Sequence, residues 1–489
     1  MKHYIRQVNI QNLFENNNHY KINLTDGCNC IYGGNGTGKT TIINLIVNSL
    51  SLGLENLAKT PFTSLTIYLS KQSMTRRYTR SKKFINITRT KFQNISSNDF
   101  GSIEISYQIF NIEDQTPLFP SEKEPVSFVF TIPPFGYDQR TEDKYIDKIC
   151  TLKSMISSSI NLTHIPLSRF YDGDLAFSRG DRDELLHSAL RRKNLSNSEI
   201  SEILDPSLKV LSSLQRQFVT QANENRKQIN EKLEKLKSSL IEKVMIDDAL
   251  VKQVSRAFTK INKLLDTEPE DINIENSLTK LTEAGIEIPE KKLEDHFTKW
   301  RNILATAKKD FQHMNSVHSD QNASSEKKFE ASQKFNSSYF SLFAMTHFND
   351  RFLSIVSDVE NMQKSKSALT KSFKDYETEV NRYLNNKHFF LTDDGHLHVF
   401  VGTRKLNLSD LSSGEKHILT ILGRAALSSD DGTVFVADEP ELSLHLDWQR
   451  KILPSVIKLS PKSQIIVATH SPSITAQNAN EINLEDCIQ

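Results

Sequence analysis

The sequence contains little cysteine and no long apolar run. Its 489 residues include only four cysteines (Cys28, Cys30, Cys150 and Cys487), and no two of them form a C-x-x-C pair. This spacing argues against a zinc ribbon or a thiol redox motif, and so few cysteines argue against a disulfide framework. The sequence contains no run of about 18 apolar residues, so it predicts no membrane span, and the start of the chain has no apolar leader. We therefore expect a soluble, cytoplasmic protein.

The chain also lacks an excess of charge of either sign. The 61 Lys and Arg residues nearly balance the 60 Asp and Glu residues, leaving a net charge of +1. Because net charge predicts no partner here, only the distribution of charge along the chain is informative. The length predicts about three units of ~150 residues each. A mean hydropathy of −0.46 indicates that part of the chain forms exposed helix.

Glycine almost disappears from residues 206–386, where Lys, Glu, Gln, Asn and Ser dominate. Within this stretch Ile229, Leu233, Leu236 and Leu240 recur with a 4-3-4 spacing, which is typical of a short coiled coil. A plain helical subdomain and a protruding antiparallel coiled coil both fit this pattern. The sequence therefore predicts a helical insertion without deciding between these two forms.

The two ends of the chain have a different pattern from the middle. Short strand-like segments over residues 3–32 and 64–132 predict an antiparallel β region. After residue 387 helices and strands alternate, which is typical of a parallel sheet covered by helices. We expect one α/β domain built from both ends: residues 1–205 and 387–489 form its two halves, and residues 206–386 form the insertion.

Residues 33–40 read GGNGTGKT and match the phosphate-loop pattern G-x-x-x-x-G-K-[ST]. An apolar strand precedes the loop and a helical pattern follows it. Glycines allow backbone N–H groups to turn toward phosphate oxygens, Lys39 supplies a positive charge, and Thr40 offers a hydroxyl to Mg²⁺. The predicted nucleotide-binding residues are Gly33, Asn35, Gly36, Thr37, Gly38, Lys39, Thr40 and Thr41.

Two acidic residues follow an apolar strand near the other end of the chain. Asp438 is placed to hold Mg²⁺ together with Thr40, and Glu439 is placed to polarise the attacking water. His470 follows the strand-like run QIIVAT, at the edge where parallel sheets bind ligands. It is a candidate hydrogen-bond donor to a γ-phosphate, although a surface histidine in a turn is an alternative. ATP and Mg²⁺ are the cofactors expected from these motifs.

The run Leu411–Glu415 (LSSGE) resembles the signature motif of ABC-type ATPases, in the variant of the SMC and RecF group. The order of phosphate loop, insertion, signature, acidic strand and switch histidine is also that of this group. The resemblance implies a signature that acts on a second subunit, made of Ser412, Ser413, Gly414 and Glu415. It further implies a head-to-tail dimer, or a higher oligomer, with ATP held between subunits. Where this group has a glutamine loop we find no glutamine, and Arg169 is the nearest substitute.

A finer resemblance is to the overcoming-lysogenization-defect and Septu-type ATPases, carried by DEPELSLHLDWQ (438–449) and VATHSPSI (467–474). Only 19 residues follow His470, too few for the TOPRIM nuclease domain of the first group. The chain thus looks like PtuA ATPases of Septu antiphage systems, whose usual partner is PtuB, a separate HNH nuclease. This resemblance implies an ATPase, with no nuclease domain of its own, that regulates such a partner. An SMC/RecF-like repair ATPase without a nuclease partner is the alternative.

Two other functions fit the sequence less well. The insertion is far too large for the motor subunit of a transporter. A protein that binds ATP without hydrolysing it would not need the full set of Lys39, Asp438, Glu439 and His470.

Residues 56–98 contain nine basic residues and no acidic one. Such a segment neutralises phosphates without reading base sequence, and interleaved aromatic residues stack on unpaired bases. The candidate DNA-binding residues are Arg76, Arg77, Arg80, Lys82 and Lys83. A solvated loop and a surface for an acidic partner are the alternatives.

Overall fold

A computed structural model describes residues 3–71, 82–92, 102–111, 117–119, 125–131, 139–165, 205–244, 261–263, 265, 290–428, 432–471, 474 and 479–489. The chain divides into two compact units. The first unit comprises Met1–Ala222 and Ser372–Gln489, and the second comprises Asn223–Lys371. No helix among the described residues is both long enough and apolar enough to cross a membrane.

A five-stranded parallel sheet forms the centre of the first unit, with strand order β15-β3-β14-β13-β9. The N-terminal half supplies β3 (Cys28–Tyr32) and β9 (Asn161–Ile165). The C-terminal half supplies β13 (Thr433–Asp438), β14 (Gln464–Ala468) and β15 (Asn480–Asn483). Strands from the two halves of the chain are therefore interleaved in a single sheet.

Both faces of this sheet are covered, which explains why Val434–Ala437 of β13 and Ile465–Ala468 of β14 are all apolar. Val434 and Val436 face the core that contains α1 (Lys39–Ser51). Phe435 and Ala437 face the opposite core, which contains α11 (Ser413–Leu427) and α12 (Leu446–Leu459). Successive strand residues point to opposite faces, so one strand joins two hydrophobic cores.

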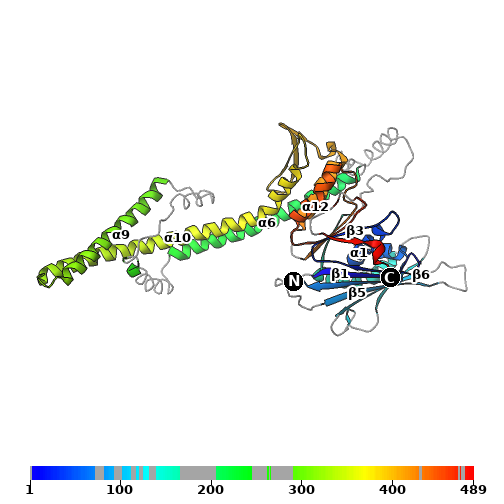
Figure 1. The fold of residues 1–489 in the computed structure, drawn as a ribbon, viewed down its shortest axis with the longest axis horizontal. Coiled ribbons are helices and arrows are strands. Elements are labelled where there is room, and N and C mark those ends of the chain that lie inside the picture. The colour runs from blue at the N-terminus through cyan, green and yellow to red at the C-terminus, as the bar shows by residue number, and fades with distance from the viewer. Residues whose placement is uncertain are drawn as a thin grey trace. The chain divides into compact units, whose positions relative to one another are not determined.

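A seven-stranded antiparallel sheet packs into the same core as α1. Its order is β2-β1-β4-β5-β6-β7, and β8 also pairs with β6. The strands are β1 (His3–Leu13), β2 (Asn18–Asn23), β4 (Ser64–Lys71), β5 (Lys82–Phe92), β6 (Ser102–Asn111), β7 (Pro117–Phe119) and β8 (Val126–Thr131). Ile67, Ile87 and Ile105 are fully buried on its inner face. Figure 1 shows β1, β5 and β6 in blue within this sheet.

Smaller elements complete the first unit. α2 (Leu54–Lys59) follows α1, and α3 (Gln139–Ser159) precedes β9. A three-stranded antiparallel sheet contains β10 (His388–Leu391), β11 (Leu397–Val401) and β12 (Arg404–Leu406). Two short 3₁₀ turns, Leu408–Asp410 and Leu484–Cys487, lie before α11 and after β15.

Long helices make up the described part of the second unit (Figure 1). They are α6 (Pro206–Val244), α9 (Glu290–Ser319) and α10 (Ser325–Asn381), and the ends of α6 and α10 belong to the first unit. α6 and α10 run antiparallel, because Asn225 Nδ2 donates to Leu369 O at 3.0 Å and Ser239 Oγ donates to Asp358 Oδ2 at 3.1 Å. The predicted fold, an α/β head from both chain ends with a helical insertion, is confirmed.

Candidate nucleotide-binding site

The loop between β3 and α1 has the backbone conformation that a phosphate cradle needs. Gly36 and Gly38 have φ angles of 79° and 92°, in the left-handed region that favours glycine. Gly38 caps α1, which begins at Lys39, so the free N–H groups of the first helical turn lie at the loop. A Cβ atom on Gly38 would lie 3.0 Å from the ring of Phe14. Sequence analysis missed Phe14, because an aromatic residue in a strand-to-strand turn carries no motif.

The Lys39 ammonium lies inside the loop. Its Nζ donates to the carbonyl oxygens of Gly33 and Gly34, both at 2.8 Å. Burial lowers the pKa of Lys39, while the carboxylates of Glu439 and Asp438 act in the opposite direction and raise it. Residues from the two ends of the chain therefore act on one another at a single site.

The remaining predicted loop residues surround this lysine. Thr37 Oγ1 donates to Gly34 O at 2.9 Å and closes the turn. Asn35 is exposed at the tip of the loop, and Thr40 and Thr41 lie half-buried in the first turn of α1. The structure thus brings all the predicted loop residues to one end of β3.

Asp438 ends β13 with a carboxylate that the protein does not neutralise. It is 2% exposed, and neither of its oxygens has a hydrogen-bond partner of good geometry. Burial, together with the negative charges of Glu439 and Glu441, raises the pKa of Asp438 to about 6. The Thr40 hydroxyl and the Lys39 ammonium partly offset this effect. A buried, unpaired carboxylate is costly unless a cation compensates it.

Glu439 and His470 form a pair beside Asp438. His470 Nε2 lies 3.3 Å from Glu439 Oε1, and both side chains remain partly exposed to solvent. Glu439 has a φ angle of 43°, and its N–H donates to Ala468 O at 2.8 Å. This bond ties the turn after β13 to the end of β14. The left-handed backbone at a non-glycine residue marks a strained position, as is common at functional sites.

Sheet topology explains how these residues meet. β14 lies between β3 and β13, and all three strands run parallel. Their carboxyl ends therefore share one edge of the sheet, where open α/β sheets bind ligands. Asp438 ends β13, while Lys39 follows β3 and His470 follows β14.

The signature residues form the N-terminus of α11. Ser412 caps the helix by accepting from the Glu415 N–H, and Glu415 in turn accepts from the Ser412 N–H at 2.8 Å, which makes a capping box. Lys387 Nζ also donates to both oxygens of Glu415, at 2.7 and 2.8 Å. The Glu415 side chain is thus engaged within its own chain, while Ser412 and Ser413 are exposed. Contact of the signature with a second subunit remains a prediction.

Close packing requires a glycine at position 414. A Cβ atom there would lie 3.0 Å from the Ser443 carbonyl oxygen and 3.4 Å from the Trp448 ring. His417, one turn further along α11, has its Nε2 2.9 Å from the Pro440 carbonyl oxygen. These contacts join the signature helix to the turn that follows Asp438. Sequence analysis gave no role to His417, which lies outside the signature run, or to Trp448, which it quoted only as part of the DEPELSLHLDWQ block.

Several predicted residues cannot be placed. Arg76, Arg77, Arg80 and Arg169 lie outside the described residues. Lys82 begins β5, and Lys83, the next residue, is half-buried. Of the basic segment 56–98, the structure describes residues 56–71 and 82–92, but not the stretch that contains the three arginines.

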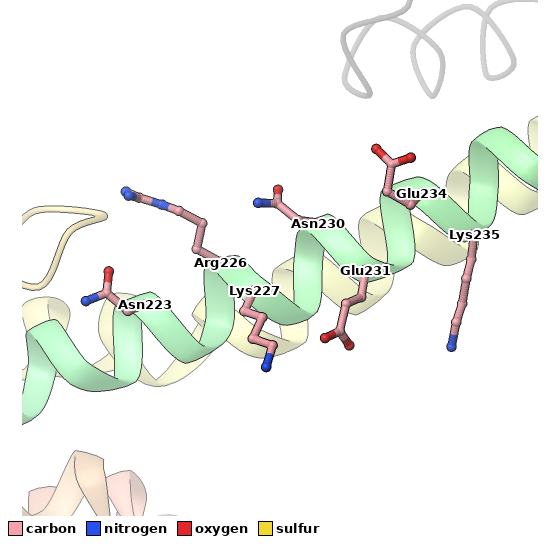
Figure 2. Close-up of a pocket in the computed structure, with 7 residues that line it drawn as sticks. All are labelled: Asn223, Arg226, Lys227, Asn230, Glu231, Glu234 and Lys235. Carbon is pink, nitrogen blue, oxygen red and sulfur yellow. The ribbon is translucent and has the colours of Figure 1, made fainter.

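A surface depression in the second unit does not resemble a ligand site. Figure 2 shows the side chains that line it diverging from α6, with some on one side of the helix and some on the other. They carry both signs of charge and do not converge on a common point. They are Asn223, Arg226, Lys227, Asn230, Glu231, Glu234 and Lys235.

Comparison with known proteins identifies the family. A family model described as AAA ATPase domain matches residues 1–475. The chain belongs to this family. The match includes the phosphate loop, the acidic strand and His470, so the pocket described above lies within the ATPase domain.

Individual proteins match the chain either over a short segment or at low sequence identity. The "Retron Ec83 probable ATPase" of Escherichia coli is 38% identical over 80 residues, which cover 14% of this chain and 15% of that protein. The SMC head domain of Pyrococcus furiosus, solved with the C-terminal domain of ScpA, is 12% identical, with a TM-score of 0.34. That alignment covers 96% of this chain and 91% of that one. The SMC head domain of Pyrococcus yayanosii is 13% identical, with a TM-score of 0.32, and covers 96% and 93%.

The chemistry of the pocket fits a divalent cation bound with a nucleotide. Among the described residues no three His, Cys, Asp or Glu side chains gather into a ready-made metal site. Mg²⁺ usually takes one or two protein oxygens and completes its shell with water and phosphate. The unpaired carboxylate of Asp438, with the Thr40 hydroxyl near it, supplies that kind of partial site.

Proposed function

We propose that this chain is the ATP-binding and ATP-hydrolysing subunit of a bacterial antiphage defence complex, and that it acts as a nucleotide-dependent sensor and clamp for an HNH nuclease partner. Membership of the ATPase family supports the enzymatic part. The defence part is supported by similarity to the retron ATPase over a short segment, and by the Septu-like motifs.

One observation carries the enzymatic proposal. Lys39 from the N-terminal half lies close enough to Asp438 and Glu439 of the C-terminal half for their charges to alter its pKa. A phosphate-binding cation, a metal-binding carboxylate and a second carboxylate therefore share one pocket. Triphosphate hydrolysis needs this combination: positioning of phosphates, neutralisation of their charge, and orientation of the attacking water.

Each residue has a separate role in the proposed reaction. The loop amides and Lys39 bind and orient the β- and γ-phosphates. Mg²⁺, when bound through Asp438 and Thr40, offsets the charge of the triphosphate. Glu439 accepts a proton from the attacking water at its carboxylate. His470 donates from its imidazole to the γ-phosphate, from a position 3.3 Å from Glu439.

A second copy of the chain completes the proposed site. The exposed Ser412 and Ser413 lie at the N-terminus of α11, where free N–H groups and the helix dipole favour an anion. We place the triphosphate of a neighbouring subunit at this helix end. Binding of ATP would close two subunits head to tail, and hydrolysis would open them, because only the closed form binds the triphosphate from both sides.

Nucleic acid is the second partner that we propose. The basic residues Arg76, Arg77 and Arg80 belong to the connection between β4 and β5. Next to this connection, the Tyr68 and Phe84 rings lie 5.7 Å apart across the two strands. Positive charges bind phosphates and aromatic rings stack on unpaired bases. A cytoplasmic location would bring the protein into contact with invading nucleic acid.

Two observations test this proposal: which protein the neighbouring reading frame encodes, and which proteins are purified together with this chain. A small HNH protein encoded beside this chain, and recovered with it after affinity purification and sizing chromatography, is the expected result. ATP is expected to shift the sizing profile toward the dimer or a higher oligomer. A chain that hydrolyses ATP and binds DNA alone, with no neighbouring HNH protein, would instead support the SMC/RecF-like repair ATPase.

A further inference from the structure

The turn after β13 contains a third acidic residue, Glu441, which none of the proposed catalytic steps uses. Its side chain is 7% exposed. One oxygen, Oε1, accepts from the Thr469 hydroxyl, from the His470 N–H at 3.1 Å and from the Ser471 N–H at 3.2 Å. The other oxygen, Oε2, is buried and has no hydrogen-bond partner.

These three bonds hold the backbone that carries the switch histidine. His470 follows β14, and two successive N–H groups there converge on one carboxylate oxygen from the turn after β13. Without this acceptor the His470 N–H would lose its partner at a site that is partly shielded from water, at a cost of about 1–3 kcal/mol, whereas the Ser471 N–H also donates to Thr469 Oγ1 at 3.0 Å. The carboxylate thus joins the ends of two neighbouring strands at the point where the site is built.

The position of Glu441 is itself fixed by its neighbours. Pro440 restricts the backbone before it, and the Pro440 carbonyl oxygen lies 2.9 Å from His417 Nε2 in α11. The turn therefore has one contact with the signature helix and another with the His470 backbone. Glu439, which lies 3.3 Å from His470 Nε2, belongs to the same turn.

We propose that Glu441 is a positioning residue that sets the location of the His470 imidazole against Glu439 and the γ-phosphate. It acts through His470 and does not contact the nucleotide. The role depends on the reach of the Glu441 side chain and on its accepting oxygen, and it does not depend on its charge. This inference rests on the proposed ATPase function, in which His470 contacts the γ-phosphate.

Three substitutions at position 441 separate the effect of side-chain length from the effect of negative charge. Glu441→Gln keeps an oxygen at the same distance and removes the charge. Glu441→Asp keeps the charge and shortens the side chain by one methylene, so the three hydrogen bonds are lost. Glu441→Ala removes both. The matched control is Glu481→Ala, which deletes an exposed carboxylate on β15.

Hydrogen exchange of the nucleotide-free protein gives a readout that needs no catalysis. We expect the His470 amide to exchange at least about tenfold faster in Glu441→Asp and Glu441→Ala, because a lost hydrogen bond of about 1.4 kcal/mol is a tenfold change. Glu441→Gln and Glu481→Ala are expected to exchange like the unchanged protein. Unaltered exchange in Glu441→Asp would overturn the proposal.

Steady-state kinetics gives a second readout. We expect Glu441→Asp to lower kcat about 10- to 100-fold, the usual effect of losing a supporting hydrogen bond to a functional group. The KM for ATP should change little, and Glu441→Gln should keep kcat within a few-fold. In a His470→Ala background, Glu441→Asp should cause no further loss, because both substitutions remove the same interaction.

The outcomes distinguish this proposal from the proposed function. An additive loss in the double variant, or a Glu441→Gln protein as slow as Glu441→Asp, would show that Glu441 does not act through His470 by hydrogen bonding. If the unchanged protein does not hydrolyse ATP, the proposed function fails, and hydrogen exchange still decides whether Glu441 holds the His470 backbone.

Discussion

The Nε2 atom of His470 lies 3.3 Å from Oε1 of Glu439, although the two residues follow different strands, β14 and β13. The pair lies beside Asp438, whose carboxylate oxygens have no hydrogen-bond partner. This relationship connects a candidate general base to a candidate phosphate contact. The roles of the two side chains can be separated by mutation. Glu439→Gln removes the charge of the candidate base, and His470→Ala removes the candidate hydrogen bond to the phosphate.

Glu439→Gln is expected to separate ATP binding from hydrolysis. The amide keeps the shape of the carboxylate but no longer accepts a proton, so kcat should fall about 10²- to 10⁴-fold. ATP binding should persist, and the closed dimer should accumulate in sizing chromatography with ATP. Glu55→Gln, an exposed position in α2, is the control. Hydrolysis at the unchanged rate would falsify the role of Glu439 as the water-activating carboxylate.

Lys39→Ala is expected to abolish tight ATP binding. The ammonium lies within the phosphate loop, and a hydrogen bond to a charged group contributes about 1.5–3 kcal/mol. The dissociation constant for ATP should therefore rise about 10- to 150-fold, as measured by calorimetry. Lys59→Ala, which removes a surface charge from α2, should leave ATP binding unchanged. Tight binding by Lys39→Ala would place the nucleotide elsewhere.

Gly414→Ala is expected to disturb the signature helix. The new Cβ would lie 3.0 Å from the Ser443 carbonyl oxygen, so α11 or the turn must move, at a cost of about 1–3 kcal/mol. We expect a lower Tm and slower ATP hydrolysis, with ATP binding to Lys39 and its loop retained. Gly27→Ala, where no atom lies within 4 Å, is the control. An equal Tm for the two variants would show that the close approach imposes no constraint.

Acid is expected to destabilise the first unit through His164 in β9. Burial, and then the Arg424 charge, lower the pKa of His164 from 6.5 to about 4. The unfolded chain therefore binds a proton between pH 6.5 and 4 that the native protein does not bind. The contribution of neutral His164 to the free energy of unfolding is fully present above pH 6.5. This contribution decreases by up to about 3 kcal/mol as the pH falls to 4.

Denaturant unfolding at several pH values tests this effect. We take the free energy of unfolding of His164→Gln minus that of the unchanged protein. This difference should increase as the pH falls from 6.5 to 4, because only the unchanged protein is destabilised through His164. His396→Gln, at an exposed position, should show no such trend. A difference between the unchanged protein and His164→Gln that does not vary with pH would contradict the shifted pKa.

Replacement of Arg76, Arg77 and Arg80 by Ala is expected to weaken the salt dependence of DNA binding. For each phosphate that the variant no longer neutralises, the slope of log K against log salt should become shallower by about 0.9 for duplex DNA. Removal of three exposed lysines from α9, Lys291, Lys292 and Lys299, is a control of equal charge. An unchanged slope in the triple arginine variant would show that this segment does not bind the DNA backbone.

Motifs with a strict spacing were predictable without coordinates. The phosphate loop specifies its own conformation, since Gly36 and Gly38 adopt the left-handed backbone that glycine permits. The apolar runs Val434–Ala437 in β13 and Ile465–Ala468 in β14 were also predictable, because strands covered on both faces are built largely from apolar residues. The outer strands β9 and β15 were not predicted. Their sequences, NLTHI and NEIN, are short and largely polar, so periodicity does not reveal them.

The sequence alone determined which residues are candidates for the chemistry, because phosphate and metal binding demand particular side chains at fixed spacings. It also determined that both ends of the chain form one α/β domain. Only the tertiary structure decided how Glu441 binds the backbone at His470, and how Gly414 meets the Ser443 carbonyl. Those contacts join segments far apart in the chain, and their partners follow from strand order and packing, which no local pattern encodes.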